Sequence, residues 1–204
     1  MRNEASWIGT IDTAKSEFGG INILVNNAGG NRPNRLVGMS FEDWKFQLAL
    51  NLDAAFLGMK YTTLVTTESG GGSVVTVSSE AGMNPWVDRS AYCAAKAGLK
   101  MLTKVAALEN AYDKNNVRVN SIPPGIIETP AWGSLSSLTD DGKDQEADVE
   151  KFAYGVAPLK YVGKPLDIAH SVLFLAHEHS RYITGAELLI DGGQSIAPPN
   201  DMTL

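Results

Sequence analysis

A tyrosine and a lysine four residues apart, Tyr92 and Lys96, are the side chains best suited to chemistry in this chain of 204 residues. They lie in a segment with a helical pattern, residues 90–113, where a separation of four places both on one face about one turn apart. A free phenol has a pKa of about 10, and a nearby ammonium lowers it toward the range used for proton exchange with an alcohol or a carbonyl. The pair predicts a tyrosine acid/base assisted by a lysine, although a solvated pair on a helix surface has the same spacing.

Two serines, Ser78 and Ser79, stand at the end of a β-branched run that begins at Ser73. Parallel α/β sheets bind ligands at the carboxyl ends of their strands, where a hydroxyl can donate to a substrate oxygen. Successive strand residues point to opposite faces, so only one of the two serines faces such a site. The spacing alone leaves open which one does, and a turn-capping role fits either.

The elements that must position these residues alternate along the chain. Ser40 and Asp43 form a capping box at the start of a long helix, and this helix is apolar on opposite sides, which predicts burial on two sides. Apolar strands between helices indicate an α/β fold with a parallel sheet covered on both faces. We expect a single domain over residues 1–204, with helices at 4–18, 41–66, 90–113 and near 165–178, strands at 21–25, 73–78, 117–120 and 187–190, and a polar loop over 130–150.

Composition excludes several classes of protein. A net charge of −6 makes a nucleic-acid partner a poor hypothesis. One cysteine, Cys93, excludes an internal disulfide and is expected to be a small core residue, and three histidines without partners at ligand spacing predict no metal site. The chain has no apolar run of about 18 residues and no signal-peptide pattern, so we expect no membrane partner and a cytoplasmic location.

Several motifs together resemble the short-chain dehydrogenase/reductase family in their order and spacing, across essentially the whole chain. They are Asn26-Asn27-Ala28-Gly29, residues 77–82, residues 90–98, residues 120–125 with Thr129, residues 182–185 and residues 190–193. The resemblance implies a Rossmann-like doubly wound parallel sheet. It also implies an NAD(P)-dependent oxidoreductase that transfers a hydride between a nicotinamide cofactor and a secondary alcohol or ketone.

The resemblance assigns the catalytic roles. Ser79 rather than Ser78 matches the family serine, because it lies thirteen residues before Tyr92. Ser79 would hydrogen-bond the substrate oxygen while Tyr92 exchanges the proton with it. Lys96 would lower the pKa of the tyrosine and hold the nicotinamide ribose, and Asn51 would complete a relay to solvent. Positioned donors and an acid suit a reaction that builds alkoxide charge.

The resemblance also implies cofactor contacts besides Tyr92 and Lys96. The backbone of the turn with Asn26, Ala28 and Gly29 would run along the adenosine part of the cofactor. The segment with Pro124, Gly125, Ile127 and Thr129 would contact the nicotinamide carboxamide. For both segments an ordinary turn is the alternative. The sequence does not discriminate NAD from NADP.

One family feature is missing, namely the glycine-rich turn that receives the cofactor pyrophosphate. Counting back from Asn26, we expect the first βαβ unit and the third strand to be absent, on the order of 55–65 residues. The strand at 21–25 would then be an exposed edge. We therefore expect weak cofactor binding and a chain that is marginally stable or aggregates.

Three functions compete. The first is the oxidoreductase, with a small-molecule alcohol or carbonyl substrate and a homo-dimer or homo-tetramer formed through helices 41–66 and 90–113. The second is a catalytically inactive fragment that acts only as an oligomerisation partner. The third is a sugar-nucleotide epimerase or dehydratase, disfavoured because no larger substrate domain follows. Trp86 and Trp132 are expected to line the pocket, residues 131–151 to cover it, and Glu80 either to touch substrate or to be solvated.

Overall fold

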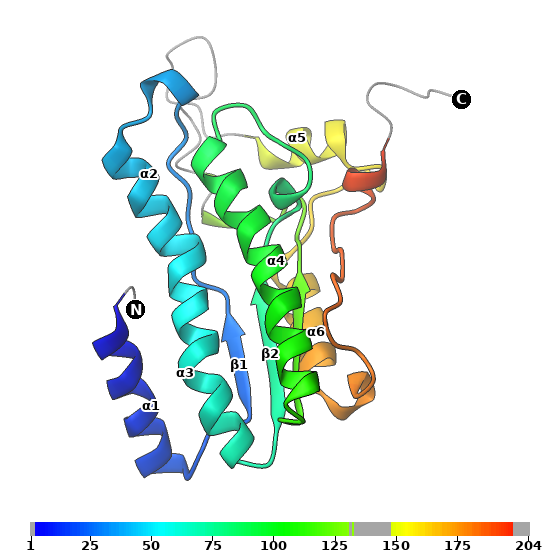
Figure 1. The fold of residues 1–204 in the computed structure, drawn as a ribbon. Helices are drawn as coiled ribbons and strands as arrows, with labels where there is room; N and C mark the ends of the chain where they lie inside the picture. Colours follow the sequence, from blue (N-terminus) through cyan, green and yellow to red (C-terminus); the bar gives the residue numbers. More distant parts are fainter. Residues whose placement is uncertain (1–2, 131, 133–147, 198–204) are drawn as a thin grey trace.

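The computed structural model describes residues 3–130, 132 and 148–197, and its helices and strands alternate as an α/β protein (Figure 1). The helices expected at 4–18, 90–113 and 165–178 are confirmed with small shifts of their ends. The elements are α1 (Glu4–Phe18), β1 (Ile23–Asn26), α2 (Phe41–Leu48), α3 (Ala54–Glu68), β2 (Gly72–Val77), α4 (Ser90–Tyr112), β3 (Val117–Ile122), α5 (Val149–Val156) and α6 (Pro165–Ala176).

The three strands form one parallel sheet in the order β1-β2-β3. Helices α3 and α4 cover one face and α6 lies on the other, and the strand arrows point toward the end of the molecule where α5 lies (Figure 1). The predicted parallel sheet with helices on both faces is therefore confirmed.

Strand alternation divides the core into two layers. Val74 packs with Met59 and Leu99 beneath α3 and α4. The next residue, Val75, packs with Leu175 of α6 on the opposite face. Both valines are fully buried, so β2 is apolar on both sides because both of its faces are covered.

The long helix expected over 41–66 contains an irregularity that the periodicity does not predict. It begins at the expected cap, where Ser40 Oγ accepts a hydrogen bond from Asp43 N at 3.0 Å. A π-helical turn over Ala49–Asp53 then separates α2 from α3. Such turns shift the following side chains around the helix axis and recur at functional sites. Asn51 lies in this turn.

The strand expected over 187–190 is wrong as a continuous strand. Ser121 and Glu187 form one isolated parallel bridge, and Pro124 and Ile190 form another. The segment stays beside β3 through hydrogen bonds such as Leu188 N to Ser121 O at 2.9 Å. Pro123, which faces this segment between the two bridges, has no N–H to donate, and this interrupts the ladder.

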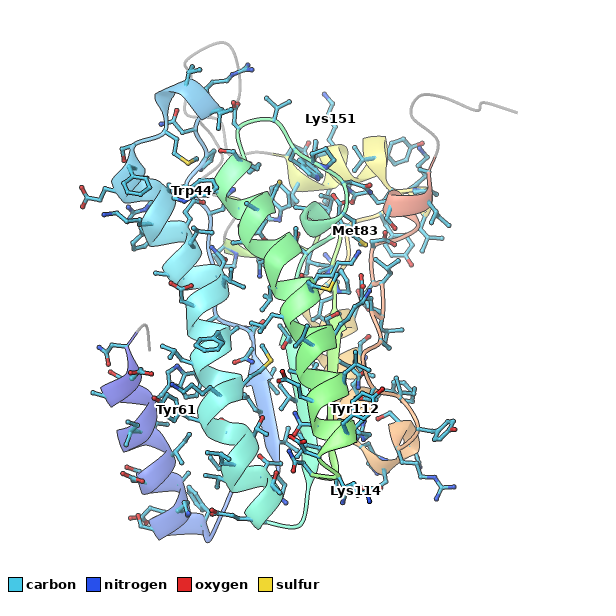
Figure 2. The ribbon with its side chains drawn as sticks, viewed as in Figure 1. Trp44, Tyr61, Met83, Tyr112, Lys114 and Lys151 are labelled. Carbon is cyan, nitrogen blue, oxygen red and sulfur yellow. The ribbon has the colours of Figure 1, made fainter. Side chains whose placement is uncertain are left out.

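Strand β1 is the edge of the described sheet, as expected, although it begins two residues later than predicted. Ile23 is 52% exposed and Val25 is 41% exposed. Helix α1 packs on α3 beyond this edge, where Tyr61 Oη donates to Glu4 Oε1 at 2.7 Å (Figure 2).

The loop expected over 130–150 lies mostly outside the described residues, and α5 begins at Val149. The covering role expected for residues 131–151 therefore falls largely on a part of the chain that the structure does not describe. Among the described helices, none combines the length and the apolar character that crossing a membrane requires.

Candidate functional site

A cleft of about 990 Å³ opens at the carboxyl ends of the strands. This is the position at which parallel α/β sheets bind ligands. Of the residues predicted from the sequence, the cleft is lined by Ser79, Tyr92, Lys96, Gly29, Pro124, Gly125, Ile127 and Thr129.

Tyr92 and Lys96 lie on one face of α4, as their spacing predicts. Lys96 Nζ is 5.6 Å from the centroid of the Tyr92 ring and donates a hydrogen bond to Val77 O at 3.0 Å. Lys96 is only 4% exposed. The structure therefore holds a buried ammonium beside a phenol at the end of β2.

The two serines after β2 have different surroundings. Ser78 Oγ donates to Lys96 O at 3.4 Å, so this hydroxyl faces the backbone of α4. Ser79 Oγ accepts from Ala81 N at 3.1 Å, and Ser79 lines the cleft with Tyr92, where its hydroxyl acts to lower the pKa of the phenol. The structure thus brings Ser79, rather than Ser78, together with the tyrosine.

Gly82 lets this loop approach α4. A Cβ atom at Gly82 would lie 2.9 Å from the carbonyl carbon and oxygen of Lys96. Neither backbone atom can move aside without disturbing α4. The missing side chain at Gly82 therefore sets the separation between the Ser79 loop and Tyr92.

The pKa of Tyr92 depends mainly on burial. Burial raises the pKa of the phenol above its ordinary value, and the Ser79 hydroxyl opposes this only in part. Desolvation of the phenol dominates the shift, and the expectation that Lys96 lowers this pKa stays a prediction. Burial also lowers the pKa of Lys96 to about 8.

Asn51 lies beneath the cleft and holds one of its loops. Its Nδ2 donates to Gly30 O at 2.8 Å and to Gln47 O at 2.9 Å, and its Oδ1 accepts from Gly30 N at 3.1 Å. Gln47, one turn earlier, pairs in the same two-way manner with the backbone of Arg32. Gln47 is not among the residues predicted from the sequence, although its separation of four from Asn51 places both side chains on one helix face.

Asn51 also lies close to the lysine. A Cβ atom at Gly29 would lie 2.9 Å from Asn51 Oδ1 and 3.5 Å from Lys96 Nζ. Only the backbone of Gly29 therefore lies between Asn51 Oδ1 and Lys96 Nζ. The absence of a side chain there keeps Asn51 and Lys96 on either side of one narrow space.

Of the residues predicted to contact the cofactor in the turn after β1, only some line the cleft. Gly29 lines the cleft, and so does Asn27, which the sequence analysis did not select. Asn26 does not line it, because its side chain is turned toward α3, where a Cβ atom at Gly58 would lie 2.6 Å from Asn26 Oδ1. Ala28 is exposed and also lies outside the lining.

The segment after β3 forms the opposite wall of the cleft. Gly125 N donates to Ile190 O at 3.0 Å, and a Cβ atom at Gly125 would lie 2.7 Å from Asp191 Cα. Gly125 is thus required for the close approach of the 190–191 segment. Trp132 Nε1 donates to Ile127 O at 2.7 Å and fixes the outer part of this wall.

Glu80 is not solvated. It is 3% exposed and accepts hydrogen bonds from Trp86 Nε1, Asn84 Nδ2 and Gln194 Nε2. Burial raises the pKa of this carboxyl, and the bonds from Trp86 and Asn84 partly oppose the shift. Glu80 ties the loop after β2 to the Gln194 turn.

Aromatic rings build one side of the cleft, as expected for Trp86 and Trp132. Phe152 of α5 lies between them, with its ring centroid 5.5 Å from that of Trp86 and 5.8 Å from that of Trp132. Tilted contacts at these distances are favourable. The apolar wall suits a hydrocarbon ring or chain.

The residues present fit the nicotinamide end of a dinucleotide cofactor. A buried ammonium, a phenol and the Pro124–Thr129 wall converge on one cleft at the strand ends. No glycine-rich pyrophosphate turn occurs in the sequence. Within the described part of the chain, no group of three His, Cys, Asp or Glu side chains is arranged to hold a metal ion.

Comparisons with known proteins agree with this geometry. A family model described as Enoyl-(Acyl carrier protein) reductase matches residues 1–195. The 2,5-dichloro-2,5-cyclohexadiene-1,4-diol dehydrogenase LinX of Sphingobium indicum is 38% identical over 196 residues, which cover 96% of this chain and 74% of LinX. The trans-4-hydroxycyclohexanecarboxylate dehydrogenase of Sinomonas cyclohexanicum is 34% identical, with 93% of this chain and 66% of that protein covered.

A solved structure gives the same result. A short-chain dehydrogenase/reductase from Burkholderia xenovorans superposes with a TM-score of 0.87 at 34% identity. The superposition covers 97% of this chain and 74% of that one.

Proposed function

Because this chain belongs to the short-chain dehydrogenase/reductase family, we propose that its cleft transfers a hydride between a nicotinamide cofactor and a secondary alcohol or the corresponding ketone, with Tyr92 as the acid/base. The observation that carries the proposal is the convergence of Ser79, Tyr92 and Lys96 in one cleft at the strand ends.

Each residue has a role that its contacts support. Ser79 donates a hydrogen bond to the substrate oxygen, which orients the carbonyl against Tyr92. Tyr92 gives its proton to that oxygen as alkoxide charge develops. Its raised pKa keeps the phenol protonated at neutral pH, which suits the direction of ketone reduction. The reverse direction needs the phenolate and gains from higher pH.

Lys96 and Asn51 act around this centre. The Lys96 ammonium supplies positive charge beside the developing alkoxide and binds the cofactor ribose. Asn51 holds the loop at Gly30 and, across Gly29, faces Lys96 closely enough for a water to join them. That water would connect the lysine to solvent.

When bound, NADH or NADPH would supply the hydride for ketone reduction, and NAD or NADP would accept it in alcohol oxidation. Pro124, Gly125, Ile127 and Thr129 form the wall against which its nicotinamide would lie, and Gly29 with its turn faces the other side. Asn26 and Ala28 shape that turn from outside the cleft.

We propose an alicyclic secondary alcohol as the substrate class. Two relatives are named for hydroxyl groups on six-membered rings, a cyclohexadiene diol and a hydroxycyclohexane carboxylate. Trp86 and Trp132 line the cleft and offer apolar surface for such a ring, and Phe152 packs against both of them.

The direct test is spectrophotometric. The full chain is incubated with NADH or NADPH and a panel of cyclic and open-chain ketones, and oxidation of the reduced cofactor is followed. We expect turnover of cyclic ketones, with one of the two cofactors preferred. Zero turnover with every pair, in a chain that melts cooperatively, would favour the alternative of an inactive oligomerisation partner.

Self-association is a further part of the proposal. A stripe of exposed apolar residues runs along α4, and Tyr112 marks its C-terminal end (Figure 2). The stripe consists of Met101, Val105, Leu108 and Tyr112, at helical spacing and 43–82% exposed. Burying it against a second copy would remove this apolar surface from water.

Sedimentation velocity tests the interface. The wild-type chain is expected to form dimers or tetramers, and Leu108→Glu is expected to shift it toward the monomer. Glu17→Lys, a charge change on the exposed face of α1, serves as the control and should leave the distribution unchanged. A monomeric wild-type chain would contradict the proposal.

A further inference from the structure

Arg89 is the buried cation in the cleft that the proposed reaction does not use. It precedes α4 and lies three residues before Tyr92, and its side chain lines the cleft while the residue is 7% exposed. Its Nη1 atom is buried and has no hydrogen-bond partner, and no described carboxylate forms an ion pair with it. Burying a guanidinium N–H without an acceptor costs free energy, so a ligand that supplies an acceptor there would bind favourably.

A structural arginine in the same protein looks different. Arg118 Nη1 donates to Leu175 O at 2.9 Å and to Ser180 Oγ at 2.7 Å, and Nη2 donates to His177 O at 3.3 Å. That guanidinium joins β3 to the end of α6 and has acceptors within the fold. Arg89 does not show this pattern.

Neither neighbouring acid forms an ion pair with Arg89, although the charge of Asp88 acts on it through space. The Asp88 carboxylate pairs with Arg35 Nε at 3.0 Å. Glu80, the buried acid of the cleft, accepts from three other side chains. A second cleft residue, Asn31, also has a buried polar atom without a partner, Oδ1. Buried polar atoms without a partner also occur elsewhere in the described fold, and among the residues that line the cleft they are Arg89 Nη1 and Asn31 Oδ1.

The backbone of Arg89 is held firmly. Its N–H donates to Trp86 O at 3.3 Å, its carbonyl accepts from Cys93 N at 2.8 Å, and the residue forms a bridge with Asn34. The guanidinium therefore projects from a fixed backbone position, three residues after Trp86 and three residues before Tyr92.

We propose that Arg89 binds a carboxylate on the substrate, so that the enzyme acts on hydroxy or keto acids whose apolar body lies against Trp86 and whose reacting carbon lies at Tyr92. The planar fork of a guanidinium matches the two oxygens of a carboxylate, and the bond is strong where water is excluded. The inference rests on the proposed function for the reacting carbon, but the anion site stands on Arg89 and its surroundings.

Binding without cofactor tests the site independently of turnover. Isothermal titration of the full chain compares cyclohexanecarboxylate with its methyl ester, which has nearly the same shape and no charge. The wild-type chain is expected to prefer the acid by about 10- to 100-fold. In Arg89→Met that preference should fall to about 1 with ester affinity retained, and in Arg89→Lys it should fall to an intermediate value.

Arg35→Met is the matched control, because it removes the neighbouring exposed arginine that pairs with Asp88. It should retain the preference of the wild type. If Arg89→Met does not fold, as judged by circular dichroism, the intermediate preference in Arg89→Lys carries the test. Equal affinity for acid and ester in the wild type, no binding of either, or an unchanged preference in the Arg89 variants would overturn the proposal.

Turnover separates the two proposals. If acid binding depends on Arg89 but no ketone is reduced, the hydride-transfer proposal fails and the carboxylate site remains. If ketones are reduced with equal kcat/KM for acids and esters, the carboxylate site fails and the oxidoreductase remains.

Discussion

Tyr92→Phe is expected to lower kcat for ketone reduction by about 10³-fold, because it removes the proton donor that general acid catalysis requires. The ring and its packing remain. KM for the ketone should change much less, since Ser79 still contacts the carbonyl. Steady-state kinetics of the two proteins measure both parameters.

Tyr112→Phe provides the matched control. Tyr112 lies on the same helix but is 82% exposed, and it is not in the cleft. Its loss should leave kcat within about twofold, as expected for a surface change away from the site. If Tyr92→Phe retains full activity, another group supplies the proton and the proposed role of Tyr92 is wrong.

Lys96→Met is expected to raise the stability of the fold at pH 7 while lowering kcat. Burial lowers the pKa of Lys96 to about 8 from an ordinary 10.5, so holding the charged form in the fold at neutral pH costs on the order of 3 kcal/mol. Methionine removes that cost but leaves Val77 O without its donor. The loss of this hydrogen bond destabilises the fold by about 1 kcal/mol. The variant should therefore be roughly 2 kcal/mol more stable at pH 7 while kcat falls by about 10²-fold or more.

The stability difference has a defined pH dependence. Between pH 8 and 10.5 the unfolded chain keeps the lysine proton while the folded chain loses it. The unfolded state then binds more protons, so wild-type stability rises with pH relative to Lys96→Met. The advantage of the variant should be full below pH 8 and should shrink as pH rises through this window.

Urea unfolding at pH 7 and at pH 9.5 measures this change. Lys100→Met serves as the control, because Lys100 lies one turn further along α4 and pairs with Glu187 at 3.1 Å. Its removal should not stabilise the protein at pH 7. A Lys96→Met variant that is less stable than the wild type at pH 7 would show that the buried ammonium has partners beyond Val77.

Much of the site was predictable because its signals are local. A separation of four on a helix puts Tyr92 and Lys96 on one face whatever surrounds them. Apolar runs between helices predict a parallel sheet, and strand ends predict where its ligands bind. The choice of Ser79 over Ser78 needed the family resemblance, and the contacts of the two hydroxyls agree with it.

Other features depend on segments distant in the chain. Asn26 was expected beside the cofactor, but Gly58 of α3 leaves room for its side chain on the other side of the strand. The continuous strand expected over 187–190 is wrong, because Pro123 in the neighbouring segment has no N–H to donate to it. The pKa of Tyr92 follows burial, which helix spacing does not report.

By itself the sequence determined the fold class and the family, and it predicted that Tyr92 and Lys96 share one helix face, because periodicity and short spacings act within a few residues. Only the tertiary structure decided which polar groups are satisfied: Glu80 has three donors, whereas Arg89 Nη1 has no acceptor. Satisfaction of a buried charge depends on which residues the fold brings around it, and those residues lie on separate loops. The sequence thus indicated hydride transfer, and the unpartnered Arg89 that only the structure reveals is the basis of the proposed carboxylate on the substrate.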